Sequence, residues 1–297
     1  MKWYEAKEQA AGTKRLFLLW YIYKIFGKNL VKFIAFFVTF FACLGAKSVR
    51  KCSEKYLKIV GVKPTFNNVF KHFLSYSYSL VDRMEIFSNN FSSEKLYFED
   101  EKQKELLLDD LKKGNGVFFI CNHLGNVDAM RSFVNSDIKD ACTSISVFLA
   151  KEQCKIFGGF IDKITKNEKI FLCPIEDIDV NTSIEIQERL NNGGIVFMAG
   201  DRTSAHSLNF ETEFLGHKVQ FPMGTFKFAQ MMEVPIYFVS AIKMPEDKYS
   251  IHLKRFENAE NKRKSMSKMQ REFIEFLEEK TKFAPFQFYH FYNMFDE

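Results

Sequence analysis

The sequence predicts an α/β protein: a mixed, mostly parallel central sheet flanked by helices on both faces, with an N-terminal hydrophobic helical membrane-attachment segment. Three observations support this. An amphipathic stretch closed by glycine precedes an apolar run twice, at 102–121 and at 183–199. Both runs, VFFIC and IVFMA, are continuously apolar rather than alternating, which is typical of strands covered on both faces. The first 60 residues, finally, are both basic and apolar.

Residues 1–60 form the first predicted unit, a basic hydrophobic helical segment that associates with a membrane. This segment carries a charge of +9, against −4 for the rest of the chain, which indicates anionic membrane lipid rather than nucleic acid as a partner. Its longest apolar run, Phe33–Ala46, has 14 residues, fewer than the roughly 20 that cross a bilayer core. The run is compatible with a core helix, an interfacial anchor or a single membrane span. Monotopic attachment is the favoured interpretation.

Residues 61–297 form the second predicted unit, the α/β domain. Its periodicity predicts a helix at 66–88 and a final amphipathic helix at 266–280. In addition to the two continuous runs, the pattern of apolar residues predicts further strands at 144–150, 169–174, 234–242 and 248–256. Gly216 predicts a hairpin-like turn, and a helix is expected to follow the Pro-x-Gly of 222–224.

Several classes of site are disfavoured by the sequence. The six cysteines are scattered without a C-x-x-C pair, which predicts small buried thiols in a reducing compartment and no metal site. The chain has neither a G-x-S-x-G elbow nor a phosphate-binding G-x-x-x-x-G-K-[ST] loop. A serine hydrolase and a P-loop enzyme are therefore both disfavoured.

Polar residues follow the two continuous apolar runs, at the strand ends where open α/β sheets place their sites. After the first run come His123 and, five residues later, Asp128. A carboxylate on one ring nitrogen fixes the tautomer of an imidazole and raises the basicity of the other nitrogen, which can then act as a general base. A capped loop histidine beside a helix N-terminal acid explains the same spacing, and the motif alone does not decide between them.

The second run ends in Asp201 and Arg202, which can pair with each other or present the guanidinium to a phosphate or an acyl oxyanion. Further on, Phe221, Pro222 and Gly224 precede a predicted helix, whose N-terminal amides can bind an anion or a carbonyl oxygen. A structural ion pair and a well-formed strand-to-helix connection are the competing interpretations.

Taken in order, these pieces resemble the lysophospholipid acyltransferase superfamily, in particular its bacterial lipid A late (lauroyl/myristoyl) acyltransferase-like branch. NHLGNVD (Asn122–Asp128) looks like the hallmark H-x4-D/E of that family. The sequences GDR, FLG…FPMG and VPIYFV follow in the same order, and the aromatic tail Phe283–Phe295 completes a match over nearly the whole chain. The lipid A enzymes more often carry glutamate at the position of Asp128, so acceptors of amino-acid-lipid or pigment-lipid pathways also stay open.

The resemblance implies an acyltransferase in which His123 is the base and Asp128 its orienting partner. It implies substrate binding by Asn122, Gly125, Asn126, Arg131, Asp201, Arg202, Phe221, Pro222 and Gly224. No metal or cofactor is expected. The implied donor is acyl-carrier protein or acyl-CoA, and the implied acceptor is a lipid or glycolipid. The implied location is the cytoplasmic face of a bacterial inner membrane. A thioesterase or lipid hydrolase on the same scaffold and a non-catalytic lipid-binding protein are the alternatives.

Overall fold

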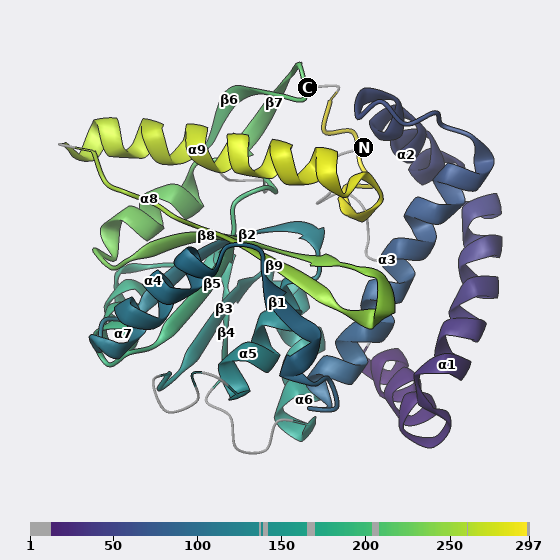
Figure 1. Ribbon diagram of the computed structural model, residues 1–297, viewed down its shortest axis with the longest axis horizontal. Coiled ribbons are helices and arrows are strands. Elements are labelled where there is room, and N and C mark those ends of the chain that lie inside the picture. Colours follow the sequence, from purple (N-terminus) through teal and green to yellow (C-terminus); the bar gives the residue numbers. More distant parts are fainter. Residues whose placement is uncertain are drawn as a thin grey trace.

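A seven-stranded sheet forms the centre of the molecule (Figure 1). The computed structural model describes residues 13–136, 138, 142–164, 170–203, 208–259 and 261–295. The strands of the sheet are β1 (Leu96–Phe98), β2 (Val117–Gly125), β3 (Ile145–Leu149), β4 (Ile170–Pro174), β5 (Ile195–Ala199), β8 (Ile236–Lys243) and β9 (Tyr249–Arg255). They lie in the order β1-β9-β8-β2-β5-β3-β4.

Most of the sheet is parallel, and the predicted α/β class is confirmed. Strands β2, β3, β4, β5 and β8 share one direction, whereas β9 pairs antiparallel with β8, and β1 pairs parallel with β9. A separate antiparallel hairpin consists of β6 (Asn209–Phe214) and β7 (His217–Pro222). Gly216, with φ of 76°, makes the predicted turn of this hairpin, where a left-handed backbone favours glycine.

The longer helices are α1 (Thr13–Gly45), α2 (Lys47–Ile59), α3 (Phe66–Phe87), α4 (Glu101–Lys112), α5 (Met130–Ser136), α6 (Lys151–Ile164), α7 (Val180–Asn191), α8 (Gly224–Met231) and α9 (Lys262–Phe283). In Figure 1, α8 and α9 lie on one side of the sheet and α4 and α5 on the other, while α1 to α3 stand together beside it. The predicted helices at 66–88 and 266–280 correspond to α3 and α9.

Both faces of the sheet are buried, as the continuous apolar strands predict. In β2, Phe118 and Ile120 join a cluster with side chains of α8 and α9, whereas Val117 and Phe119 join a second cluster with α4 and α5. Successive strand side chains point to opposite faces, so covering both faces requires apolar residues at every position. The result is a rigid centre whose carboxyl edge can hold polar side chains in fixed places.

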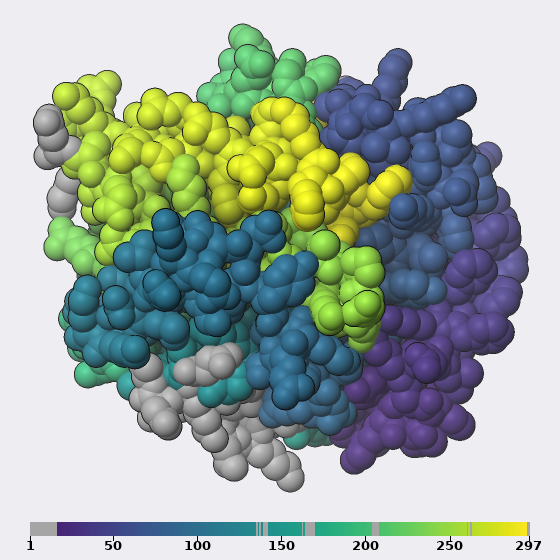
Figure 2. All heavy atoms as spheres, in the orientation of Figure 1, coloured from purple at the N-terminus to yellow at the C-terminus, as the bar shows by residue number. Residues whose placement is uncertain are grey.

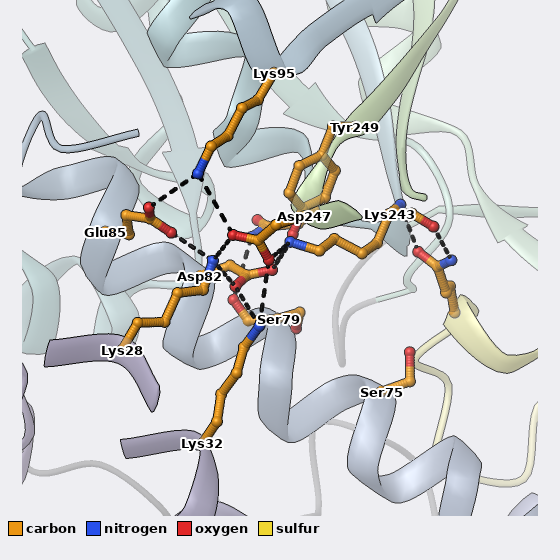
Figure 3. A network of polar contacts seen from close by, with 12 residues as sticks. Lys28, Lys32, Ser75, Ser79, Asp82, Glu85, Lys95, Lys243, Asp247 and Tyr249 are labelled. Carbon is orange, nitrogen blue, oxygen red and sulfur yellow. Dashed lines mark hydrogen bonds and ion pairs between the residues drawn. The ribbon is translucent and has the colours of Figure 1, made fainter. Parts of the chain in front are cut away.

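Helix α1 packs on α3 and is also tied to it by charge (Figure 3). Asp82 of α3, with a side chain 1% exposed, lies 2.9 Å from Lys28 Nζ of α1 and 2.7 Å from Lys243 Nζ of β8, and it accepts a hydrogen bond from Tyr249. Lys28 also contacts Asp247 in the β8–β9 turn. This ion network joins α1, α3 and the sheet.

The stretch Phe17–Gly45 of α1 is long and apolar enough to cross a membrane. Within it, 11% of the residues of an apolar 18-residue segment are buried inside the protein. The helix is kinked at Gly27, which has φ of 75° and ψ of 177°. Figure 2 shows α1 and α3 forming one flank of the molecule, with the C-terminal residues (yellow) beside α2 and α3 (blue). Residues 1–12, which include Trp3 of the predicted membrane segment, lie outside the described residues.

Candidate active site at the end of β2

The site begins where β2 separates from β5. The two strands pair as far as Cys121 and Ala199, after which β2 continues to Gly125 without β5. On its other edge, β2 pairs irregularly with β8 between Cys121 and Gly125. The Asn122 side chain fills this irregularity by donating hydrogen bonds to Val239 O and Ser240 Oγ, at 3.2 and 2.9 Å. Asn122 is therefore a buried scaffold residue that fixes the backbone just before His123.

Asp201, two residues beyond the end of β5, is the hydrogen-bond partner of His123. Its Oδ2 accepts a hydrogen bond from the backbone N–H of His123 at 2.7 Å, and its Oδ1 lies 2.8 Å from His123 Nδ1. Because a carboxylate only accepts, Nδ1 carries the proton and Nε2 keeps a free lone pair. Asp201 is fully buried, whereas one third of the His123 side-chain surface is exposed. This geometry suits a general base.

A second residue that contacts this carboxylate comes from the C-terminal tail. His290 Nε2 lies 2.9 Å from Asp201 Oδ2. The tail reaches this point along the edge of β2 that β5 has left: Phe288 forms a bridge with Leu124, and the Tyr289 N–H donates to His123 O at 3.0 Å. Sequence reasoning missed His290, although the aromatic tail around it was part of the family resemblance.

Opposing effects set the protonation of the site. Burial alone would raise the pKa of the Asp201 carboxyl, but its attraction to His123 and the hydrogen bonds from His123 and His290 hold that pKa well below its usual value. Burial and the charge of Arg202 lower the pKa of His123, against the upward pull of Asp201. Burial lowers the pKa of His290 to about 4. Near pH 7 the group is therefore an ionised carboxylate between two neutral imidazoles.

The predicted pairing of Asp128 with His123 is wrong in this structure. Asp128 lies in a 3₁₀ turn, Val127–Ala129, and its carboxylate is 2.5 Å from Arg83 Nε of α3. Gly125, with φ of 71°, turns the chain between the two residues. His123 is still in β2 and has cross-strand neighbours, so Asp201 rather than Asp128 orients its ring.

The other predicted residues near the motif are held by contacts within the protein, and their role in substrate binding stays a prediction. A Cβ on Gly125 would lie 2.0 Å from Ala241 O, so only glycine fits there. Asn126 is buried; its N–H donates to Ala241 O, and its side chain donates to Ser79 O of α3. Arg131 is buried, and its guanidinium lies over the Phe87 ring, 5.1 Å from the centroid.

The two downstream predictions differ in outcome. Arg202 lies beside the site, where Nη2 donates to Tyr289 O at 2.9 Å. Phe221 and Pro222 are buried, and Phe221 packs on aromatic rings of the β6–β7 hairpin; their contact with a substrate stays a prediction. Gly224, where α8 begins, is exposed. The next residue of α8, Thr225, donates a hydrogen bond to Ala199 O, at the end of β5. The N-terminus of α8 is thereby fixed next to the strand that delivers Asp201.

Among the residues that the structure describes, two groups have side chains of the kind that hold metal ions: His123, Asp201 and His290 at the site, and Asp82, Glu85 and Asp247 in the ion network. In the first, each carboxylate oxygen already accepts a ring N–H at hydrogen-bond distance. In the second, lysine ammonium groups contact the carboxylates. We therefore assign the first group as a hydrogen-bonded network and the second as an ion network.

A hollow of about 600 Å³ lies at the other end of the strands from His123, where β8 begins and β9 ends. Its lining includes Pro235, Arg255 and Asn258 and no residue of the His123 site. Because open α/β sheets bind ligands beyond the carboxyl ends of their parallel strands, the surroundings of His123 are the better candidate for the functional site.

A scan against protein-family models and a search of the curated proteins find no match for this chain.

Proposed function

We propose that the protein is a membrane-associated acyltransferase that moves a fatty acyl chain from a thioester donor, acyl-carrier protein or acyl-CoA, to a hydroxyl of a lipid or glycolipid acceptor. One observation carries the proposal: the Asp201 carboxylate holds Nδ1 of a partly exposed histidine, which leaves Nε2 free to accept a proton. The family resemblance of the H-x4-D region and of the motifs after it gives the direction of the chemistry.

The reaction needs one base and one site for negative charge. His123 Nε2 removes the proton of the acceptor hydroxyl as the oxygen attacks the thioester carbonyl. The C–O bond forms, the C–S bond breaks, and the proton passes from the imidazolium to the departing thiolate. Arg202 lies close enough to His123 to lower its pKa, so its charge also acts on the oxyanion that develops beside the ring.

The outer face of α1 supports attachment to the membrane from one side. The large apolar side chains that α1 exposes are Leu18, Tyr21, Ile25, Phe26, Leu30, Phe33, Ile34, Phe36, Phe37, Val38, Phe41 and Leu44. The opposite face packs on α3, and Lys28 and Lys32 in the middle of the helix contact acids of the ion network. A spanning helix would place these lysines in hydrocarbon, so an orientation in the plane of the interface is favoured. By the resemblance, the membrane is a bacterial inner membrane, contacted from the cytoplasmic side.

The test is acyl transfer by the full-length protein in detergent or vesicles. Acyl-carrier-protein and acyl-CoA donors are supplied with a lipid extract, and mass spectrometry identifies the acceptor that gains the chain. We expect His123→Ala to abolish transfer, since general-base assistance contributes about 10²- to 10⁴-fold, while the variant still floats with vesicles. Full activity of His123→Ala would reject the proposal.

The same experiment separates the alternatives. Acylation of an amino-acid lipid or a pigment lipid would name a different acceptor for the same chemistry. Release of free fatty acid that added lipid does not divert would indicate a thioesterase. Binding of lipid without any acyl transfer would indicate a non-catalytic protein.

A further inference from the structure

His290 has one polar interaction through its ring. The side chain is 1% exposed, and Nε2 donates to Asp201, whereas Nδ1 has no hydrogen-bond partner among the residues that the structure describes. The ring stacks on Phe288 with centroids 4.0 Å apart, and Tyr292 lies 5.0 Å away. A phenylalanine would fill the same space without the cost of burying a polar ring. The polarity of His290 is therefore used for its contact with Asp201.

That contact completes the surroundings of the carboxylate. Asp201 accepts three N–H groups, two from His123 and one from His290. The third donor reaches it across 89 positions of sequence and lies on Oδ2, so Oδ1 stays directed at His123 Nδ1. A buried carboxylate with three donors keeps its charge and its orientation.

We propose that His290 is a positioning residue for the acyl transfer: acting through Asp201, it holds His123 in the orientation and tautomer that leave Nε2 free. The inference deepens the proposed function and rests on it. The charged groups that face His123 are Asp201, Arg202 and Arg83, and His290 adds a neutral donor to this set.

The backbone of the tail supports the same role. The residue before His290 donates its N–H to His123 O, and its carbonyl accepts from Arg202. His290 is thus seated on a segment that touches both the base and the arginine beside it. A shift of the tail would move the imidazole of His290 and the backbone of His123 together.

Three variants test the proposal. His290→Phe keeps the aromatic packing and removes the donor, and His290→Gln returns a donor. The matched control is His72→Phe: His72 is also buried, has its pKa lowered to about 4, and donates from Nε2 to Phe288 O of the same tail at 3.0 Å, without touching Asp201. Thermal unfolding of all three proteins reports the structural cost.

We expect His290→Phe to lower kcat about 10- to 100-fold with little change in KM, and His290→Gln to recover most of that loss. The acidic limb of the kcat/KM profile should move upward by roughly half a pH unit in His290→Phe, since Asp201 then attracts the His123 proton more strongly. His72→Phe should leave this limb in place, whatever it costs in stability.

A second readout does not need activity. NMR titration of the imidazoles in ¹³C/¹⁵N-histidine-labelled protein, assigned with His123→Ala, follows the pKa of His123 directly. A rise in His290→Phe with none in His72→Phe supports the positioning role even if no acyl transfer is found, in which case the proposed function alone fails. An unchanged His123 titration in His290→Phe, or equal effects of the two phenylalanine variants, would overturn the inference.

Discussion

Asp201 and Asp82 are both buried carboxylates, yet their surroundings give them different roles. Asp201, at the end of β5, accepts N–H groups of two neutral imidazoles and a backbone amide. Asp82, on α3, is contacted by the ammonium groups of Lys28 and Lys243 and by the Tyr249 hydroxyl (Figure 3). Ammonium groups cancel the charge of Asp82, whereas an imidazole that donates one proton to Asp201 keeps a basic lone pair on its other nitrogen.

The two regions also differ in what they hold in place. The Asp82 network fixes the apolar α1 to the sheet through the lysines of two elements. Burial disfavours the charged form of Lys28, but the carboxylates of Asp82, Asp247 and Glu85 stabilise that form. The pKa of Lys28 is therefore raised. The chemistry of the partners, and not the burial of the acid, distinguishes the ion network from the candidate active site.

The largest expected effect on rate, after loss of His123 itself, is that of Asp201→Asn. An amide cannot accept from both N–H groups of His123, so the ring loses its orientation and the tautomer with a free Nε2 loses its support. We expect kcat to fall by roughly 10³-fold, measured in the acyl-transfer assay. Asp82→Asn, which removes an equally buried charge, should leave the pH profile unchanged. Equal rate losses in both would remove the distinction between the two sites.

Asp82→Asn should instead have the largest effect on stability. Removing one partner of a buried ion network leaves Lys28 and Lys243 without their closest acid, at a cost of about 3–5 kcal/mol in the free energy of unfolding. Thermal and urea unfolding followed by circular dichroism measure this loss. Glu54→Gln is the control, because its pair with Arg50 is partly exposed and is worth about 1 kcal/mol at most. A change as small for Asp82→Asn would contradict the assembly role.

The pH dependence of kcat/KM reports the protonation of His123. His123 must be neutral to accept a proton, and burial together with the Arg202 charge lowers its pKa below the ordinary 6.5. The acidic limb should therefore have its midpoint below pH 6.5, with activity lost as pH falls through that value. Arg202→Gln removes one depressing charge and should move the midpoint upward. A midpoint above 6.5 in the unmodified protein would show that Asp201 dominates instead.

Asp128→Asn is expected to have the smallest effect. Its carboxylate pairs with Arg83 and not with the His123 ring, so the substitution should reduce kcat by less than about 10-fold, the range of a partly exposed ion pair. The comparison with Asp201→Asn in one assay decides which acid orients the base. A loss for Asp128→Asn as large as that for Asp201→Asn would restore the partner that the motif predicts.

Much of the fold was predictable because strands buried on both faces are apolar at every position. VFFIC, IVFMA and VPIYFV became β2, β5 and β8, and the helix-then-strand units gave the parallel sheet. Among the elements that were missed, β1 has three residues, too few for a periodic pattern, and α6 contains Gly158 and Gly159, which lower its helix propensity. Arg83, which pairs with Asp128, and His290, which donates to Asp201, were missed as well, because both lie far from their partners in the sequence.

His123 and Asp201 each come shortly after a continuous apolar run, and this pattern alone predicts that polar groups meet at the carboxyl edge of a parallel sheet. The tertiary structure alone decided which acid meets the imidazole. His123 and Asp128 are five positions apart but are separated by the turn at Gly125, whereas strand pairing of β2 with β5 brings Asp201 to Nδ1 across 78 positions. Sequence spacing predicts proximity within a helix or turn, but at the end of a strand the nearest side chain belongs to the neighbouring strand.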